Sequence, residues 1–276
     1  MSEQKTIDPS NKPRTRRTLA ADLENLGVKE GMNVIVHSSM SAIGWICGGP
    51  VAVIQALQDV VTAHGTIIMP TQSPNLSDPK DWENPPVPRS CWQTIREEMP
   101  AFDPRITPTF GMGTIVETFR MFPGVKRSKH PTYSFAAWGK HRDEIVVNHS
   151  PENGLGEHSP LAKIYDLNGH ILLLGVGYDS NTSMHLGEHR SGCLKTTTNG
   201  APIFEKGKRV WKTFGEIEYD EEVFPEIGQA FEQQNEISYG KIGSAESRLM
   251  PQRKIVDFTA NFLKKGHSTC HCPNEL

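Results

Sequence analysis

The chain has 276 residues, 36% of them hydrophobic and 22% charged, and a formal net charge of −3. This length fits one large domain, because single hydrophobic cores stop growing at roughly 250–300 residues. The basic residues are scattered and the net charge is negative, which argues against a nucleic acid partner. No apolar run approaches the ~20 residues that cross a bilayer, so we expect no membrane partner either.

The two ends of the chain differ in composition from its middle. Residues 1–16 are polar and contain two prolines, so we expect a disordered N-terminal segment there. We expect a single domain over 17–265 and a disordered tail over 266–276. The N-terminus lacks the apolar segment of a secretory signal, which predicts a cytoplasmic protein. The tail carries Cys270-His271-Cys272, which we interpret as a disordered end with adventitious affinity for zinc.

The first predicted elements are a helix and a buried strand. Three leucines with helical spacing precede Gly27, a residue type that often follows a helix; they are Leu19, Leu23 and Leu26. Residues 33–36 then form a short apolar run with β-branched side chains, as expected of a strand that is buried on both faces.

A second helix and strand complete a parallel unit. A loop rich in glycine and serine over 37–50 leads to a helix whose core face runs from 53 to 61, and residues 66–69 give another buried strand. Residues 33–69 thus have the length that a parallel crossover requires. The next connection, 70–88, contains six prolines, and we interpret it as the rim of an active site.

Helices and strands continue to alternate, with helices predicted at 89–99, 113–122, 140–148 and 160–167, and strands at 135–138 and 171–174. Residues 209–213 alternate like an exposed antiparallel strand, and helices are predicted at 221–234 and 251–264. The pattern predicts an α/β protein with three layers, α/β/α, around a central mixed, partly parallel sheet.

The first group of residues with chemical potential is His37-Ser38-Ser39-Met40-Ser41-Ala42-Ile43-Gly44, between a strand end and a helix. In open α/β sheets, ligands bind at the carboxyl ends of strands, where hydroxyls and free N–H groups can hold a polar chain or a phosphate. From local sequence alone, a long capped turn explains the segment equally well.

This string, continued by Trp45 and Gly48-Gly49, resembles the N-terminal signature of the aminoglycoside 3-N-acetyltransferases, a family unrelated to the GNAT acetyltransferases. Further family-like blocks follow in order: Gly65-Thr66 to Pro70-Thr71, Arg127-Ser128-Lys129-His130 to Trp138-Gly139, and Gly154-Leu155-Gly156 with Ser159-Pro160-Leu161. The resemblance covers about residues 15–265 and is nearest to the YokD-like branch of the family.

The resemblance implies acetyl-CoA as the acetyl donor, bound in a tunnel without any required metal. It assigns cofactor binding to His37, Ser38, Ser39, Met40, Ser41, Gly44, Thr71 and Arg127. For Arg127, a contact to coenzyme A phosphates and a bracing role toward loop carbonyls remain equal alternatives. Cys47, near the same loop, has no base beside it in sequence. We therefore interpret it as a residue without a catalytic role, and not as an acyl acceptor.

The second group is His185-Leu186-Gly187-Glu188-His189. If Asn181 or Thr182 caps a helix there, His185 and Glu188 share one face, and the carboxylate can orient the imidazole as a general base. The resemblance places the catalytic histidine at His185, with Glu188 as its acidic neighbour. The same string fits a zinc hydrolase with His185 and His189 as ligands, Glu188 as base and Glu246 as a third ligand by position. A solvated helix end is a further alternative.

The implied substrate is an aminoglycoside, whose 3-amine attacks the acetyl carbonyl directly while His185 takes the proton. A mildly acidic protein suits such a polycation. Asp179 and Glu188 are the best-placed candidates for binding its ammonium groups, and the acidic stretch of Asp78, Asp81 and Glu83 is left unassigned. Another amine acceptor and a non-catalytic, coenzyme A-binding regulator remain open, as does the oligomeric state, a homo-oligomer included.

Overall fold

The buried apolar runs of the sequence form the centre of a seven-stranded sheet. In the computed structural model, which describes residues 13–266, strand β1 (Asn33–Ser38) pairs in parallel with β2 (Thr66–Pro70) on one side and β5 (His170–Leu174) on the other. The strands predicted at 33–36, 66–69 and 171–174 are therefore confirmed. Because all three run in the same direction, their carboxyl ends meet at one edge of the sheet.

Antiparallel strands extend this parallel centre on both sides, which makes the sheet mixed as predicted. The strand order is β3-β4-β2-β1-β5-β9-β8, with antiparallel pairs at β4–β2 and β9–β5. The added strands are β3 (Lys126–Arg127), β4 (Phe135–Gly139), β8 (Ser238–Ile242) and β9 (Ala245–Pro251). Of these four strands, only β4 was predicted from the sequence.

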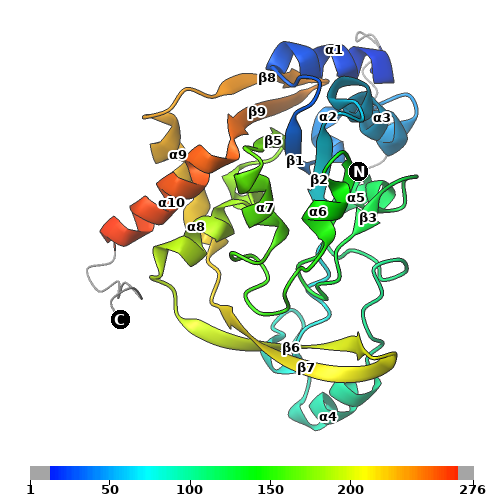
Figure 1. The fold of residues 1–276 in the computed structure, drawn as a ribbon, viewed down its shortest axis with the longest axis vertical. Coiled ribbons are helices and arrows are strands. Elements are labelled where there is room, and N and C mark those ends of the chain that lie inside the picture. The colour runs from blue at the N-terminus through cyan, green and yellow to red at the C-terminus, as the bar shows by residue number, and fades with distance from the viewer. Residues whose placement is uncertain (1–12, 267–276) are drawn as a thin grey trace.

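Helices cover both faces of the sheet, giving the three predicted layers (Figure 1). One face packs against α1 (Arg16–Leu26), α3 (Gly49–Val61) and α5 (Gly113–Arg120). The other packs against α6 (Arg142–Val146), α7 (Pro160–Asp166), α8 (Met184–Ser191), α9 (Phe224–Glu232) and α10 (Gln252–Gly266). Side chains alternate across β1: Val34 and Val36 face the first layer and Ile35 the second.

A long two-stranded ribbon lies beside the three layers, at the bottom of Figure 1. It consists of β6 (Thr196–Glu205) and β7 (Lys208–Ile217), and helix α4 (Arg89–Glu98) lies against it. The Arg209 guanidinium on β7 donates to the main-chain oxygen of Met99 at 3.1 Å, which ties the segment after α4 to the ribbon. The single strand predicted at 209–213 is thus one half of a hairpin.

The remaining elements are short. They are α2 (Met40–Ile43) within the predicted loop 37–50, and three 3₁₀ turns: η2 (Pro79–Asp81), η3 (Tyr178–Ser180) and η4 (Glu221–Val223). The predicted disordered ends lie mostly outside the described residues, as does Cys270-His271-Cys272. At the N-terminal side, however, residues 14–16 are ordered, because Arg14 pairs with Ile46 and Thr15 caps α1.

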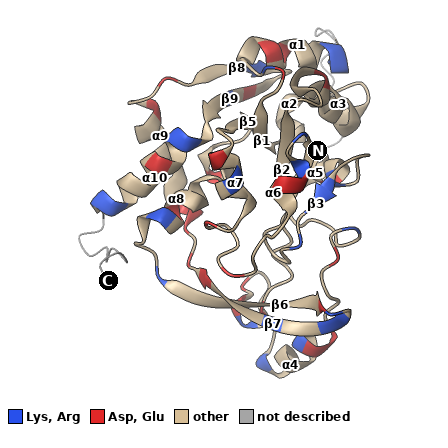
Figure 2. Cartoon of the chain, viewed as in Figure 1, with Lys and Arg blue, Asp and Glu red and all other residues tan. Residues whose placement is uncertain are grey.

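Charges of both signs are interspersed along the chain (Figure 2). Among residues 13–266 there is no helix long and apolar enough to span a bilayer.

Candidate active site

A cavity of about 290 Å³ opens where the parallel strands end. Its wall includes residues from the end of β1, the end of β2, the loop before α5, and the segment that joins β5 to α8. Those that bear on the chemistry are His37, Ser38, Gln72, Met112, Asp179, His185 and Glu221. The cavity thus brings together side chains that are far apart in the sequence, such as His37 and Glu221, which are 184 residues apart.

His185 stands at the start of α8 and is oriented by Glu188, one turn further along. The imidazole Nδ1 lies 2.5 Å from Glu188 Oε2, and the glutamate side chain has no exposed surface. The other carboxylate oxygen accepts from the Asp220 amide at 2.9 Å. A carboxylate that accepts from Nδ1–H leaves Nε2 as the basic nitrogen, which is the arrangement of a general base.

Two aromatic rings hold the imidazole from the side. The ring centroids of Tyr219 and Phe224 lie 4.7 Å and 4.9 Å from that of His185. The His185 side chain is 12% exposed, so it reaches the cavity while most of its surface is covered by protein. Restricting the ring in this way limits the rotamers that a catalytic base would otherwise sample.

The helix that carries this pair begins differently from the prediction. Neither Asn181 nor Thr182 caps it: the N-cap is Ser183, which makes no side-chain capping bond, and Asn181 Oδ1 accepts from the Ser183 amide instead. Gly187, which weakens the helix in isolation, has a packing role. A Cβ there would lie 2.6 Å from Thr259 Cβ on α10, so glycine permits the two helices to approach closely.

His189 belongs to a second network and not to a metal site with His185. Its Nε2 lies 2.8 Å from the Tyr219 hydroxyl, which donates to Glu216 Oε1 at 2.6 Å. The pKa of Tyr219 is raised above its ordinary value, and burial is the largest cause. The hydroxyl therefore keeps its proton. The network holds Tyr219 against the His185 ring.

The position of Glu246 also argues against its role as the third ligand in a zinc site. The Glu246 side chain is 72% exposed and pairs with Lys241 at 3.0 Å. In the described part of the chain, no group of three His, Cys, Asp or Glu side chains is arranged to hold a metal ion. His185, which lines the cavity, is oriented by the Glu188 carboxylate instead.

The residues predicted to bind the cofactor fall into three sets. His37 and Ser38 line the cavity from the end of β1. Ser39 and Ser41 lie at the start of α2 with their hydroxyls 3.0 Å apart, and Met40 packs at the edge of the first core layer. Gly44 ends α2 with a φ of +90° beside the Arg14 guanidinium, a conformation that side-chain-bearing residues rarely adopt.

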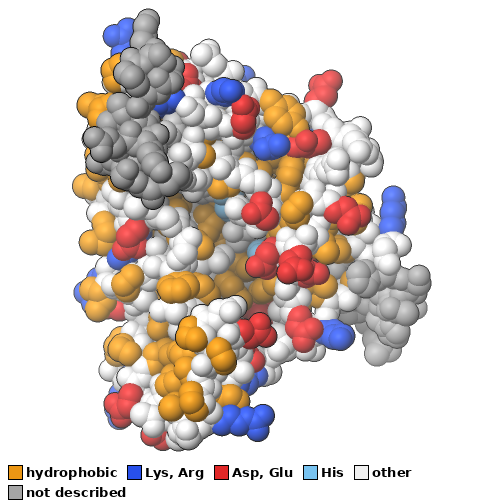
Figure 3. Space-filling view, turned by 180° about the vertical axis from the view of Figure 1, so that it is seen from behind, with side chains coloured by type: hydrophobic (Ala, Val, Ile, Leu, Met, Phe, Trp, Pro, Cys, Tyr) orange, Lys and Arg blue, Asp and Glu red, His pale blue; other side chains and the backbone are white. Residues whose placement is uncertain are grey.

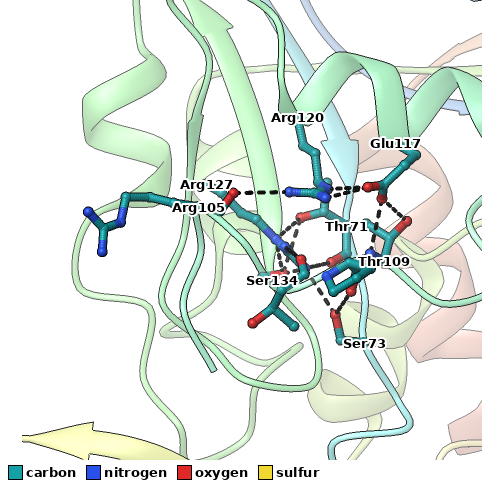
Figure 4. A network of polar contacts seen from close by, with 10 residues as sticks. Thr71, Ser73, Arg105, Thr109, Glu117, Arg120, Arg127 and Ser134 are labelled. Atoms are coloured by element: carbon teal, nitrogen blue, oxygen red, sulfur yellow. Dashed lines mark hydrogen bonds and ion pairs between the residues drawn. The ribbon is translucent and has the colours of Figure 1, made fainter. Parts of the chain in front are cut away.

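The third set, Thr71 and Arg127, is placed differently from the prediction. Both side chains are buried, and the Arg127 guanidinium donates to the main-chain oxygens of Thr71 and Thr107 and to the hydroxyls of Thr71, Ser73 and Ser134 (Figure 4). Most of its donors are thus directed to protein groups, and Arg127 does not line the cavity that contains His185, which favours the bracing alternative over a phosphate contact there. Thr71 likewise faces this network and not the cavity.

The acidic residues also separate into two sets. Asp179 and Glu221 are exposed at the cavity wall, whereas Glu188 is enclosed with both oxygens engaged, so its predicted contact with substrate ammonium groups is wrong. Asp78 pairs with Arg96 at 2.7 Å and is structural. Figure 3 shows acidic side chains beside a central hollow in which histidine atoms are visible.

Sequence reasoning missed Glu221, Tyr219 and Glu216. They come from the end of β7 and the turn after it, and only tertiary packing brings them to α8. The signal that could have indicated them is the acidic stretch around 216–222, which contains an aromatic residue and follows an exposed strand.

The cavity thus brings together one imidazole held by a buried carboxylate and the exposed carboxylates of Asp179 and Glu221. The chain belongs to the aminoglycoside 3-N-acetyltransferase family, whose model matches residues 35–264, and it is therefore an acyltransferase. It is 54% identical over 265 residues to the SPbeta prophage-derived aminoglycoside N(3′)-acetyltransferase-like protein YokD of Bacillus subtilis (strain 168), covering 96% of this chain and 97% of that one.

Solved structures give the same result. The crystal structure of YokD from Bacillus subtilis matches with a TM-score of 0.93, 53% identity and coverage of 95% and 97% of the two chains. AAC-IIIb, solved as a binary complex with CoASH, matches with a TM-score of 0.84 at 29% identity, covering 94% and 99%. AAC-VIa bound to sisomicin matches with a TM-score of 0.84 at 28% identity, covering 94% and 100%.

Proposed function

We propose that this protein transfers the acetyl group of acetyl-CoA to the 3-amino group of a 2-deoxystreptamine aminoglycoside, with His185 as the general base. The observation that carries the proposal is the 2.5 Å contact between His185 Nδ1 and the buried Glu188 carboxylate, at the wall of a cavity where the parallel strands end. Family membership supports the acyl-transfer chemistry, and the site supplies the base that this chemistry needs.

An amine attacks a thioester only in its neutral form, so a protonated substrate amine first releases one proton to solvent. A base is then needed because the attacking nitrogen must lose a second proton. As the nitrogen forms its bond to the acetyl carbon, His185 Nε2 accepts the proton that the nitrogen loses. Glu188 stabilises the resulting imidazolium and keeps the ring in place. The tetrahedral intermediate then re-forms the carbonyl, the carbon–sulfur bond breaks, and coenzyme A leaves as its thiolate, without a covalent enzyme intermediate.

Acetyl-CoA would approach along the segment between β1 and α2. His37 and Ser38 line the cavity there, and Ser39, Met40, Ser41 and Gly44 continue the same segment. The binary complex of AAC-IIIb with CoASH supports this use of the fold. Thr71 and Arg127 would act indirectly, by fixing the segment around Gln72 that forms the opposite wall.

The aminoglycoside would approach the exposed carboxylates of Asp179 and Glu221. Both lie on the cavity wall with His185, so an ammonium group held by them stays close to the base. The complex of AAC-VIa with sisomicin supports an aminoglycoside as the acceptor. A different amine on the same site is the second candidate, because an acidic rim attracts any polyamine.

Steady-state thiol release from acetyl-CoA tests the proposal. We expect release to be stimulated by deoxystreptamine aminoglycosides more than by simple polyamines, and to be lost in His185→Ala. His64→Ala is the matched control, since His64 is 82% exposed and lies outside the cavity. Release that no aminoglycoside stimulates, with a simple polyamine as the preferred acceptor, would replace the first candidate by the second.

A further inference from the structure

His37 lines the active-site cavity without a partner for one of its ring nitrogens. The residue is 6% exposed, and its Nε2 is buried and has no hydrogen-bond partner among the described residues. Buried polar atoms are nearly always paired in folded proteins, because an unpaired one gives up its bonds to water. A ligand bound in the cavity would supply the hydrogen-bond partner that the His37 ring nitrogen lacks.

The strand geometry places His37 on the same side of the sheet as His185. Residues alternate along β1, so His37 faces the layer that Ile35 faces, which is the layer that contains α8. His37 is also opposite Leu173 of β5, next to the connection that leads to Asp179 and then to α8. Two histidines from different elements therefore face one cavity.

Only one of the two imidazoles is equipped to act as a base. His185 is held by a carboxylate, whereas the Nε2 atom of His37 has no hydrogen-bond partner, carboxylate or other, among residues 13–266. Burial, followed by the nearby charge of His185, lowers the pKa of His37 to about 3. His37 therefore stays neutral while His185 takes up a proton, and a neutral imidazole carries one N–H in either tautomer.

We infer that His37 is a second catalytic residue, whose ring N–H donates a hydrogen bond to the thioester carbonyl oxygen of acetyl-CoA. This inference rests on the proposed function. As the amine attacks, the carbonyl π electrons move to oxygen, and the negative charge that develops there strengthens the bond from His37. No proton is transferred to that oxygen, and the bond weakens again when the carbonyl re-forms and the thiolate leaves. A fixed hydrogen-bond donor is the usual device for stabilising such an oxyanion.

The carbonyl stretch of bound acetyl-CoA reports this hydrogen bond directly. We would measure it by infrared difference spectroscopy with acetyl-CoA labelled at the carbonyl carbon, together with calorimetric binding and kcat. We expect the stretch to shift to lower frequency on binding to the wild type. His37→Ala and His37→Phe remove the donor, and the second retains most of the volume should alanine prevent folding. Either should bind acetyl-CoA, lose the shift and lower kcat by about 100-fold or more.

His37→Gln keeps a neutral N–H and should retain part of both the shift and the rate, which a purely structural role would not produce. His64→Gln is the control at an exposed histidine. A shift and a kcat that survive in His37→Phe would overturn this inference and leave the proposed function intact. A wild type that neither binds nor turns over acetyl-CoA would overturn the proposed function and this inference with it.

Discussion

Glu188 lies fully buried against His185, with its Oε2 atom 2.5 Å from the imidazole Nδ1 and its Oε1 atom bonded to the Asp220 amide. A carboxylate in this position can fix the tautomer of the ring and offset the positive charge that the ring acquires as a base. The pair therefore has the geometry of a base and its orienting partner, and several measurements follow from it.

Replacing the orienting carboxylate should impair chemistry more than binding. In Glu188→Gln the neutral amide cannot offset the imidazolium charge, so we expect kcat to fall by about 10²-fold or more while acetyl-CoA still binds. Steady-state kinetics and calorimetric titration check this. Glu246→Gln is the control, because Glu246 is exposed on β9. Equal losses of kcat in both variants would contradict the assigned role.

Arg127 should contribute to stability and not to phosphate binding. Its guanidinium is part of a buried network that joins Thr71, Thr107 and Ser134, so Arg127→Ala leaves several acceptors unpaired. We expect the free energy of unfolding to fall by about 3 kcal/mol, as measured by chemical denaturation. Lys129→Ala, at an exposed basic neighbour, should leave stability unchanged. Unchanged stability of Arg127→Ala with weaker coenzyme A binding would restore the phosphate interpretation.

Gly187 should be required for the placement of α8. A Cβ in Gly187→Ala would lie 2.6 Å from Thr259 Cβ and 2.8 Å from the main-chain oxygen of Val256, so α8 must move away from α10. We expect a loss of about 1–3 kcal/mol in stability and a lower kcat, because His185 moves with its helix. Gly266→Ala, where a Cβ would have no neighbour within 4 Å, is the control. Wild-type stability and kcat in Gly187→Ala would show that the contact can relax freely.

Stability should decline in mild acid because of buried neutral histidines. Burial lowers the pKa of His149 to about 4, while the unfolded chain retains a value near 6.5. The unfolded chain therefore takes up a proton first, so the contribution is complete above pH 6.5 and is lost as the pH falls toward 4. Its full size is on the order of 3 kcal/mol.

Chemical denaturation at pH 7 and pH 5 measures this effect. His149→Gln should reduce the difference in unfolding free energy between the two pH values, whereas the exposed His64→Gln should leave it at the wild-type size. An unchanged difference in His149→Gln would show that His149 titrates normally in the folded protein.

The sequence predicts the parallel centre of the fold because β1, β2 and β5 are buried on both faces and consist of continuous apolar runs. It does not predict β6, whose sequence begins Thr-Thr-Thr-Asn-Gly and lacks alternation, so that only pairing with β7 defines it. The strands β8 and β9 are missed because their sequences are short and polar: β8 is largely exposed, and β9 begins Ala-Glu-Ser-Arg.

In the candidate site, too, local contacts can be predicted from the sequence and long-range contacts cannot. His185 and Glu188 are three residues apart on one helix, so their pairing can be read from local spacing. The partners that hold them, Asp220 and Tyr219, come from about 30 residues further along, and sequence spacing carries no information on that contact. Arg127 has the residue type expected of a phosphate ligand. Only the structure shows that it is buried and donates hydrogen bonds to other protein groups.

Single-turnover acetyl transfer by His185→Ala tests the central claim most directly. With acetyl-CoA and an aminoglycoside both bound to saturation, the measured rate reports chemistry alone. We predict a rate at least about 100-fold below that of the wild type, with acetyl-CoA affinity unchanged. A His185→Ala rate within a few-fold of the wild type would contradict the claim that this imidazole is the base.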